Sequence, residues 1–586
     1  MVKYLLGVLT GVLIIFFLVI AVIIVGALAA GGGQSGVPND AVLTLDLSGA
    51  LPENVASPIQ FDFLHAGPPA TLLTVRRAVE RAAKDERIKA LALDCGGLGA
   101  GWGKVAELRD VIAEFKKSGK PVLAYMEVAG TIDFLVASAA DEIHMAPEGR
   151  LDMKGLRAEV AFYKDTFEKI GVEAELEWVG KYKSAVEPYS RDSMSDAFRE
   201  VVESQLDGLL ELLVEMGSSS RGLTPEQFRA ALDQGPFLSP QAKELGLVDQ
   251  LSYPDQFEDR IKEKVGLDEI EMVSLRRYNQ ASLSELDLGS KRKIAVVYGV
   301  GTIVGGMGDA DPFFGSELLA GDAFVDMLDQ VRKDEDLEAV IVRIDSPGGD
   351  ALASDRMWRA LQLLREEKPV IISMSDVAAS GGYYMAMAKD TPILAYPGTY
   401  TGSIGVYFGK FNLRGLYDKI GLRKEILTRG KFASIDTDYR SLTDDERTKL
   451  REGVEAVYDS FVSKVADARG KSWDEINEVA QGRVWLGKEG LGNGLVDELG
   501  GYERAIALAK EKAGIGADEE VALATYPKAK TILEVLFEHD GMGAQGLASA
   551  PLFPASWAER FDPQGLLPAL AGGGMLAVTP YSWTIR

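Results

Sequence analysis

Residues 246–249 read Gly-Leu-Val-Asp, and the same four residues return at 494–497, 248 positions further along the chain. Lys120-Pro121-Val122 and Lys368-Pro369-Val370 are separated by the same 248 positions. Other matched pairs have offsets of 249 or 250: Lys84-Asp85 with Lys333-Asp334, Asp141 with Asp390, Pro147 with Pro397, and Gly180-Lys181 with Gly430-Lys431. Chance matches would scatter in offset, so this nearly constant spacing predicts a duplicated domain.

Within each copy, short apolar runs alternate with amphipathic segments. Residues 294–297 and 339–342 are typical of buried strands, and residues 103–117 and 351–366 are typical of helices. This alternation predicts an α/β fold in which crossover helices join parallel strands. We expect one repeat over residues 41–265 and a second over residues 293–512. Residues 525–586 have no counterpart and form an appended tail whose role the sequence leaves open.

The N-terminus carries a different signal. Residues 5–30 contain no charged side chain, and a helix of that length spans a hydrocarbon core of roughly 30 Å. Residues 1–33 are therefore predicted to be a transmembrane anchor and tether, although the small residues at 27–30 keep a cleavable signal peptide open. Lys3 precedes the apolar run, so the N-terminus should be cytoplasmic and the body extracytoplasmic, tethered to the inner membrane by a single pass.

Composition excludes several function classes. The 586 residues include 63 Lys and Arg against 88 Asp and Glu, a net charge of −25, which argues against nucleic acid as a partner. The single cysteine, Cys95, cannot form an internal disulfide or a CxxC motif. Three histidines without metal-binding spacing predict no metal site, and His144 is expected to pack within a strand.

A serine in a glycine-rich turn is the first candidate for chemistry. Ala378-Ala379-Ser380-Gly381-Gly382 follows an apolar strand and precedes a short helical run. A serine at such a turn fits a nucleophile elbow, with the Gly381 N–H at the helix start available to an oxyanion. The alternative is a serine that only caps the helix. Asp345-Ser346-Pro347-Gly348-Gly349 also follows a strand, and is either a backbone cradle for a substrate oxygen or a plain turn.

Comparison of the two repeats supplies a base for that serine. Gly180-Lys181-Tyr182-Lys183-Ser184 aligns with residues 430–434, which places Lys183 opposite Ala433. Ser380 in turn aligns with Gly130 or Thr131, so one repeat keeps the lysine and the other keeps the serine. Such complementary loss is expected of one site shared by two halves. The alternative is that Lys183 is an ordinary solvated lysine, because a base must be buried enough to become neutral.

The motifs together resemble the signal peptide peptidase A family in its long, duplicated form. They are the N-terminal anchor, residues 180–188, residues 345–349, residues 378–383 and Thr-Gly-Ser-Ile-Gly-Val at 401–406. The resemblance implies two crotonase/ClpP-like repeats and a serine protease in which Ser380 is the nucleophile and Lys183 the general base. It further implies that Ser403 positions the lysine amine and that the amides of Gly348, Gly349 and Gly381 form the oxyanion hole.

The same resemblance implies substrates and partners. They are hydrophobic peptides, above all cleaved signal peptides left in the membrane, with no cofactor and four chains in a homotetramer. Two competing functions remain at this point: a non-catalytic membrane scaffold and an acyl-CoA-handling enzyme, both on the same fold. The mutual loss of serine and lysine argues against a scaffold, and an extracytoplasmic body argues against acyl-CoA.

Overall fold

The computed structural model describes residues 36–54, 70–285, 292–306, 318–528 and 574–578. The predicted anchor lies outside these ranges, as does most of the tail. Among the described residues, no helix is long and apolar enough to cross a membrane.

The first repeat is built on a mainly parallel sheet. Its strands lie in the order β6-β4-β3-β2-β1-β8, with β7 also paired to β4. They are β1 (Ala41–Ala50), β2 (Ile88–Gly99), β3 (Val122–Gly130), β4 (Glu142–Asp152), β6 (Phe237–Leu238), β7 (Gln250–Leu251) and β8 (Glu271–Ser274).

The second repeat has the same topology, which confirms the predicted duplication. Its strands lie in the order β18-β16-β14-β12-β9-β20, and β15 joins β14 to β19. They are β9 (Lys293–Val300), β12 (Leu337–Ser346), β14 (Val370–Ala379), β15 (Ile393–Ala395), β16 (Tyr400–Gly402), β18 (Val484–Leu486), β19 (Glu498–Leu499) and β20 (Ala522–Tyr526). The predicted strands 294–297 and 339–342 lie within β9 and β12.

Each sheet ends on a strand beyond the predicted end of its repeat. β8 pairs in parallel with β1, and β20 pairs in parallel with β9. Both strands are short, and each follows a helix after the last residue matched between the repeats. Neither strand therefore lies within the repeat boundaries predicted from the sequence, residues 265 and 512.

The repeated Gly-Leu-Val-Asp has a structural role in both copies. In the first, Arg221 donates from Nε to the Gly246 carbonyl at 2.9 Å and pairs with Asp249 at 2.6 Å. In the second, Arg469 donates from Nε to the Gly494 carbonyl at 2.8 Å and pairs with Asp497. Each arginine ends a 26-residue helix, α7 (Asp196–Arg221) or α16 (Asp444–Arg469), so the motif anchors that helix to its sheet.

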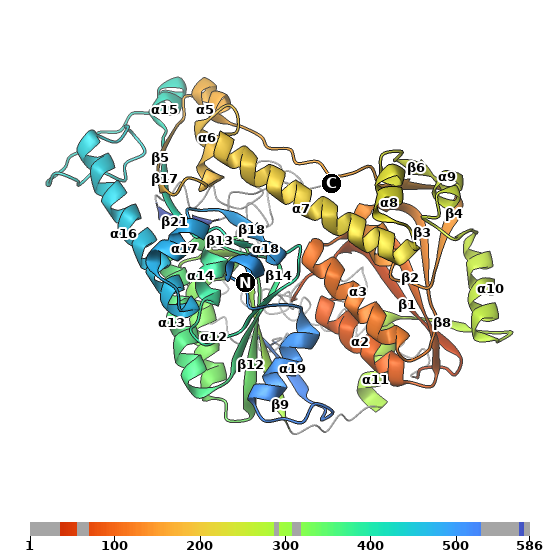
Figure 1. Cartoon of the computed structure of the whole chain (residues 1–586). Helices are drawn as coiled ribbons and strands as arrows, with labels where there is room; N and C mark the ends of the chain where they lie inside the picture. The colour runs from red at the N-terminus through yellow and green to blue at the C-terminus, as the bar shows by residue number, and fades with distance from the viewer. Residues whose placement is uncertain (1–35, 55–69, 286–291, 307–317, 529–573, 579–586) are drawn as a thin grey trace, which may run out of the picture.

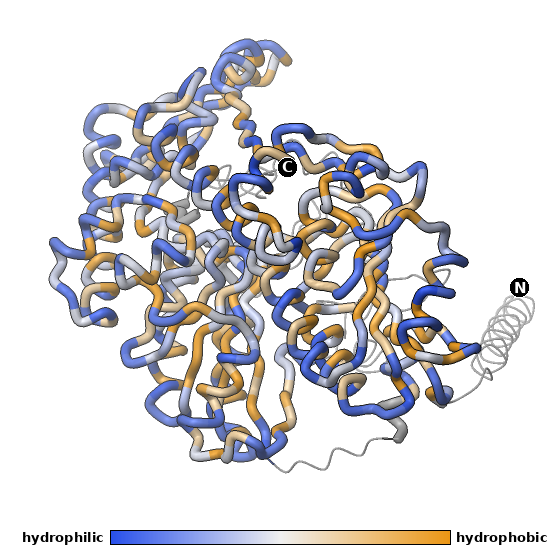
Figure 2. The backbone as a smooth tube through the Cα atoms, turned by 45° about the vertical axis from the view of Figure 1, so that its right-hand side comes forward, coloured by the Kyte–Doolittle hydropathy of each residue, from blue (hydrophilic) through white to orange (hydrophobic). Residues whose placement is uncertain are grey.

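The other helices cover the sheets or connect them. The two predicted helices appear as α3 (Trp102–Lys116) and α13 (Ala351–Glu367). The remaining ones are α2 (Leu72–Lys84), α4 (Thr131–Ala137), α5 (Lys164–Ile170), α6 (Glu187–Ser190), α8 (Pro225–Leu232), α9 (Ser239–Glu244), α10 (Pro254–Val265), α11 (Leu275–Glu285), α12 (Gly321–Lys333), α14 (Gly381–Ala386), α15 (Arg414–Ile420), α17 (Trp473–Val479), α18 (Gly487–Asn493) and α19 (Tyr502–Lys512). Figure 2 shows the hydrophobic residues along the strands and the hydrophilic ones along the outer turns.

A third sheet joins the two repeats. Its order is β11-β10-β13-β21-β17-β5, and its strands are β5 (Glu173–Val179), β10 (Thr302–Val304), β11 (Leu318–Ala320), β13 (Gly348–Asp350), β17 (Val406–Asn412) and β21 (Gly574–Val578). β5 belongs to the first repeat but pairs antiparallel with β17 of the second. In Figure 1, α5, α6 and β5 accordingly lie beside α15 and α16, and α7 returns to the first repeat. This crossover carries residues 180–188 into the second repeat.

Candidate active site

Ser380 occupies a strained turn between β14 and α14. Its backbone has φ 54° and ψ −115°, a conformation that a non-glycine residue adopts only when its surroundings enforce it. Its N–H donates to the Gly402 carbonyl at 2.7 Å, and its carbonyl accepts from the Tyr384 N–H at 2.8 Å. Its side chain makes no capping hydrogen bond to α14. The helix-cap alternative is therefore wrong.

The Ser380 hydroxyl instead meets Lys183. The Lys183 Nζ lies 2.8 Å from Ser380 Oγ, 3.1 Å from Ser403 Oγ and 3.2 Å from the Ser403 carbonyl oxygen. Lys183 is 1% exposed, and both serines are fully buried. Lys183 is therefore not a solvated surface lysine. It contacts both Ser380 and Ser403, which lie 197 and 220 positions further along the chain.

Lys181, two residues before Lys183, is exposed rather than buried. Its side chain is 58% exposed and lies near Glu200, and its repeat counterpart Lys431 is likewise exposed and paired with Asp445. The lysine shared by both repeats therefore lies on the surface, and the unshared one lies in the site.

Burial controls the charge of Lys183. Desolvation lowers the pKa of this amine well below its usual value, because a buried ammonium loses its hydration. Its hydrogen bonds run to hydroxyl and carbonyl oxygens, which are neutral and do not restore the charge. A neutral amine beside a hydroxyl has the lone pair that a general base requires.

This burial predicts a gain in stability when the amine is removed. Between the lowered pKa and the usual value of about 10.4, the unfolded chain binds a proton at Lys183 that the folded chain does not bind. Wild-type stability should therefore rise with pH across that window. Lys183→Met should raise the unfolding midpoint near pH 7, and its advantage should shrink toward pH 10. Calorimetric scans at both pH values, with Lys181→Met as the exposed control, measure this; a Lys183→Met midpoint below wild type at pH 7 would contradict it.

Two glycines make room for the lysine. A Cβ on Gly482 would lie 2.6 Å from the Lys183 Cα, and one on Gly405 would lie 3.1 Å from its Cδ. Gly482 also has φ 80°, which disfavours other residues. Sequence reasoning missed both. Gly405 lies within the 401–406 motif and could have been suspected, whereas Gly482 carries no signal in the sequence.

The Gly348-Gly349 turn packs against the start of α14. A Cβ on Gly382 would lie 2.5 Å from the Ser346 carbonyl oxygen, so only glycine allows this approach. Gly348 has φ 100°, and its N–H donates to Ser346 Oγ at 3.2 Å. Gly381 is the first residue of α14, where N–H groups have no carbonyl partner within the helix. The turn and the helix start thus lie together, and Ser346 is a further residue of this turn that the sequence did not single out.

The tail contributes a strand at the same place. β21 lies between β13 and β17, antiparallel to both, with Gly348 opposite Val578 and Gly349 opposite Ala577. Residues 574–578 of the tail, whose role the sequence left open, therefore lie beside the Gly348-Gly349 turn. We refer to the gap in the third sheet between β13 and β17, which β21 fills, as the peptide slot.

The first repeat has a glycine at the position that corresponds to Ser380. Gly130 is the N-cap of α4, as Ser380 is the N-cap of α14, so Gly130 is the counterpart of the serine. There the buried Asp133 carboxylate accepts the Leu98 N–H at 2.9 Å and the Gly130 N–H at 2.7 Å. A carboxylate of the chain itself therefore occupies backbone donors at the C-terminal ends of β2 and β3.

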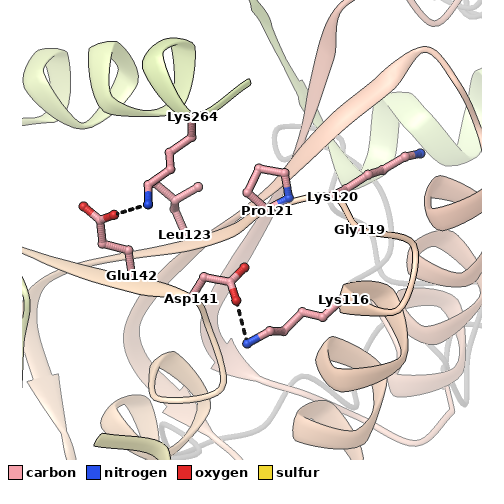
Figure 3. A pocket seen from close by; sticks show the side chains of 8 residues that line it. All are labelled: Lys116, Gly119, Lys120, Pro121, Leu123, Asp141, Glu142 and Lys264. Atoms are coloured by element: carbon pink, nitrogen blue, oxygen red, sulfur yellow. Dashed lines mark ion pairs between the residues drawn. The ribbon is translucent and has the colours of Figure 1, made fainter. Parts of the chain in front are cut away.

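Two other features lie apart from Ser380. A pocket of about 350 Å³ lies in the first repeat. Among its lining residues, Lys116 pairs with Asp141 and Lys264 with Glu142 (Figure 3). His144 is buried in β4, as predicted, with Nδ1 2.7 Å from Ser252 Oγ and Nε2 2.9 Å from Glu142. None of the predicted site residues lines the pocket.

Comparison with known proteins agrees with the duplicated fold. The model described as "Peptidase family S49" matches residues 114–268 and again residues 362–516. "Serine protease SPPA, chloroplastic" of Arabidopsis thaliana is 36% identical over 86% of this chain and 74% of its own. "Protease 4" of Salmonella typhi and "Protease 4" of Haemophilus influenzae are each 30% identical, over 80% and 81% of this chain and 76% and 79% of theirs.

These matches define a serine peptidase built from two copies of one α/β domain. The chain belongs to peptidase family S49 and has the long, duplicated form of signal peptide peptidase A. The scaffold and acyl-CoA alternatives are thereby set aside.

Proposed function

We propose that this chain is an endopeptidase with a Ser–Lys dyad, in which Ser380 is the nucleophile and Lys183 the general base. The observation that carries the proposal is the 2.8 Å contact between Lys183 Nζ and Ser380 Oγ inside a fully buried site. The elbow conformation of Ser380 and the lowered pKa of Lys183 support it independently.

The chemistry follows from that geometry. Neutral Lys183 accepts the Ser380 proton as Oγ attacks the peptide carbonyl, while Ser403 holds the amine in place through its hydroxyl and carbonyl oxygens. The carbonyl oxygen becomes an oxyanion facing the amides of Gly348, Gly349 and Gly381. The ammonium then protonates the leaving amine, which releases one product and leaves an acyl-Ser380 ester. Lys183 next takes a proton from a water molecule, whose oxygen attacks the ester carbonyl. The bond between that carbon and Oγ then breaks, the second product leaves as a carboxylic acid, and the Lys183 ammonium returns the proton to Ser380 Oγ.

The substrate binds in the peptide slot as an extended strand. β21 supports this, because a segment of the chain itself already pairs with both walls of the slot. The walls carry glycine in β13 and buried apolar residues in β17, Val406, Tyr407 and Phe408 among them. We therefore assign hydrophobic peptides as substrates, most specifically cleaved signal peptides left in the membrane.

We further propose a membrane location, which rests on the apolar run at residues 5–30. It tethers the body to the inner membrane by a single pass, with the N-terminus cytoplasmic and the peptidase outside. Four chains assemble into a homotetramer, as the family resemblance implies, and no cofactor takes part.

A fluorophosphonate probe tests the dyad. It should label the purified full-length protein at Ser380, identified by peptide mapping, and labelling should abolish cleavage of a hydrophobic peptide. Labelling at another serine, or cleavage that survives complete labelling, would refute the proposal.

Removal of β21 should activate the enzyme. Because β21 and a substrate strand compete for the same slot, a chain that ends at Gly573 should have a lower KM, on the order of tenfold if the slot is closed about 90% of the time. Initial rates across peptide concentrations measure this, and a synthetic peptide of residues 570–586 should restore competitive inhibition. Unchanged kinetics in the shortened chain would exclude competition by the tail.

A further inference from the structure

A second lysine of the first repeat reaches into the second repeat near Ser380. The N-terminus of α3 lies directly against β14. A Cβ on Gly101 would lie 2.4 Å from the Asp376 Cγ, and one on Gly103 would lie 2.5 Å from the Ser375 carbonyl oxygen. Only glycine at both positions permits this approach, so the segment Gly101-Trp102-Gly103-Lys104 is shaped for contact between the repeats.

Asp376 of the second repeat caps the helix of the first. Its Oδ2 accepts the Gly101 N–H at 3.0 Å, and its Oδ1 accepts the Lys104 N–H at 2.9 Å. These are the donors that a helix normally satisfies with its own capping residue, and Gly101, the N-cap of α3, has no side chain to do so. The cap therefore fixes Asp376 relative to α3.

The Lys104 side chain then joins two carboxylates. Its Nζ lies 2.8 Å from Asp345 Oδ2 and 3.4 Å from Asp376 Oδ2, and the side chain is only 11% exposed. The other oxygen of Asp345, Oδ1, accepts the Val377 N–H at 3.1 Å. We call this set, Lys104 with Asp345 and Asp376, the Lys104 bridge.

The Lys104 bridge lies beside a bulge, where the regular pairing between β12 and β14 is interrupted. β12 and β14 pair in register up to Ile344 opposite Met374, but Ser346 lies opposite Ala378, so β14 has two extra residues at this step. Asp376 and Val377 fall within this bulge. The bulge interrupts the backbone hydrogen bonds between β14 and β12, although Val377 still pairs with Tyr400 of β16 on the other side. On the β12 side, side chains therefore take over the role of the missing backbone contacts. Just beyond it, β12 leads into the Gly348 turn and β14 into Ser380.

We propose that Lys104 is a positioning residue for the active site, because its bridge fixes the turn that carries Gly348 relative to the strand that carries Ser380. This inference rests on the proposed Ser–Lys mechanism. It gives the first repeat two contributions to the site of the second: the base and the bridge that sets the distance between nucleophile and oxyanion donors.

The two lysines have opposite electrostatic environments. Burial alone would lower the pKa of Lys104, but the carboxylates of Asp345 and Asp376 raise it well above its usual range. Lys183 is buried more deeply, its hydrogen-bonding partners are neutral, and its pKa is lowered. Lys104 therefore stays charged as a structural cation, while Lys183 is available as a base.

Three variants of the full-length protein test the bridge. Lys104→Met removes it. Lys104→Met combined with Asp345→Asn also removes the charge of the carboxylate that has lost its cation, while the amide oxygen can still accept from the Val377 N–H. Lys104→Arg retains a cation able to contact both carboxylates. The matched control is Lys116→Met, which removes an ion pair with Asp141 from the other end of α3, in the pocket of Figure 3.

For each variant and for the control, the experiment measures kcat and KM of peptide cleavage and the unfolding midpoint. We expect kcat of Lys104→Met to fall roughly 100-fold, the cost of a misplacement of about 1 Å, with KM within about threefold. The double variant should recover the wild-type midpoint but not kcat, Lys104→Arg should stay within about tenfold of wild type, and Lys116→Met should be unaffected.

Each outcome decides the inference. A Lys104→Met kcat near wild type would overturn it, and so would a double variant that regains both stability and kcat, because Lys104 would then be only a counter-ion. If Lys104→Met alone does not fold, the double variant carries the test. Ser380→Ala in the same assay separates the two hypotheses, since activity in that variant would refute the dyad, whatever Lys104 does.

Discussion

Replacement of Ser380 by alanine should reduce peptide cleavage to the background rate, a loss on the order of 10⁴-fold or more. In the proposed mechanism the Ser380 Oγ forms the acyl-enzyme, and alanine leaves Lys183 with no hydroxyl to deprotonate at this position. Because the serine is fully buried and its strained backbone is held by Gly402 and Tyr384, alanine should fit without rearrangement. Cleavage of a hydrophobic peptide and covalent capture by a fluorophosphonate probe measure the loss.

Ser354→Ala is the matched control for this variant. Ser354 is also fully buried in the second repeat, but its hydroxyl donates to the carbonyl of Asp350, the N-cap of α13, at 2.7 Å. Both variants should unfold near the wild-type temperature, and only Ser380→Ala should be inactive. Equal activity in the two variants would show that Ser380 takes no part in the chemistry.

Sequence comparison within the chain was sufficient to predict the fold and the central contact. Matched offsets reveal duplication because both copies keep the same anchors, such as Arg221 with Asp249 and Arg469 with Asp497. The unmatched positions revealed the site for the opposite reason. A residue retained in one copy and lost in the other is not needed for the shared architecture, which singled out Lys183 and Ser380.

The residues that sequence reasoning missed act through contacts between distant segments. Gly482 is required only because Lys183 lies against it, and the two are about 300 residues apart in the chain. Lys104 resembles any helix lysine until Asp345 and Asp376 are placed beside it. The pairing of β21 with β13 joins residues more than 200 positions apart. Periodicity and motif spacing describe local structure, so none of these contacts leaves a pattern in the sequence.

The two repeats differ at the turns that follow β3 and β14. In the first repeat, the Asp133 carboxylate accepts the backbone N–H groups of Leu98 and Gly130, so it lies beside the counterpart of Ser380. In the second, the residue three positions after Ser380 is Tyr383, whose hydroxyl points elsewhere and donates to the Leu495 carbonyl at 2.9 Å. The crossover through β5 brings Lys183 of the first repeat to Ser380 of the second.

Lys183→Met should abolish cleavage about as completely as Ser380→Ala, because a nucleophile and its base act as one unit and their losses do not add. Methionine fills similar space but has no lone pair that could accept the serine proton at neutral pH. The wild-type rate should fall as pH drops through the lowered pKa of Lys183, since protonation removes the same lone pair. The pH profile of kcat/KM and the rate of acylation by a fluorophosphonate measure both effects.

Lys183→Arg separates basicity from positive charge. A guanidinium with a pKa above about 12 cannot accept a proton near neutrality, and it is also too large for the space bounded by Gly405 and Gly482. Arginine should therefore fail to rescue activity. Lys181→Met, two residues away and on the surface, should keep wild-type rates. If Lys183→Met retained normal turnover while Lys181→Met lost it, the base would be Lys181; if both remained active, Ser380 would have to be activated without a lysine.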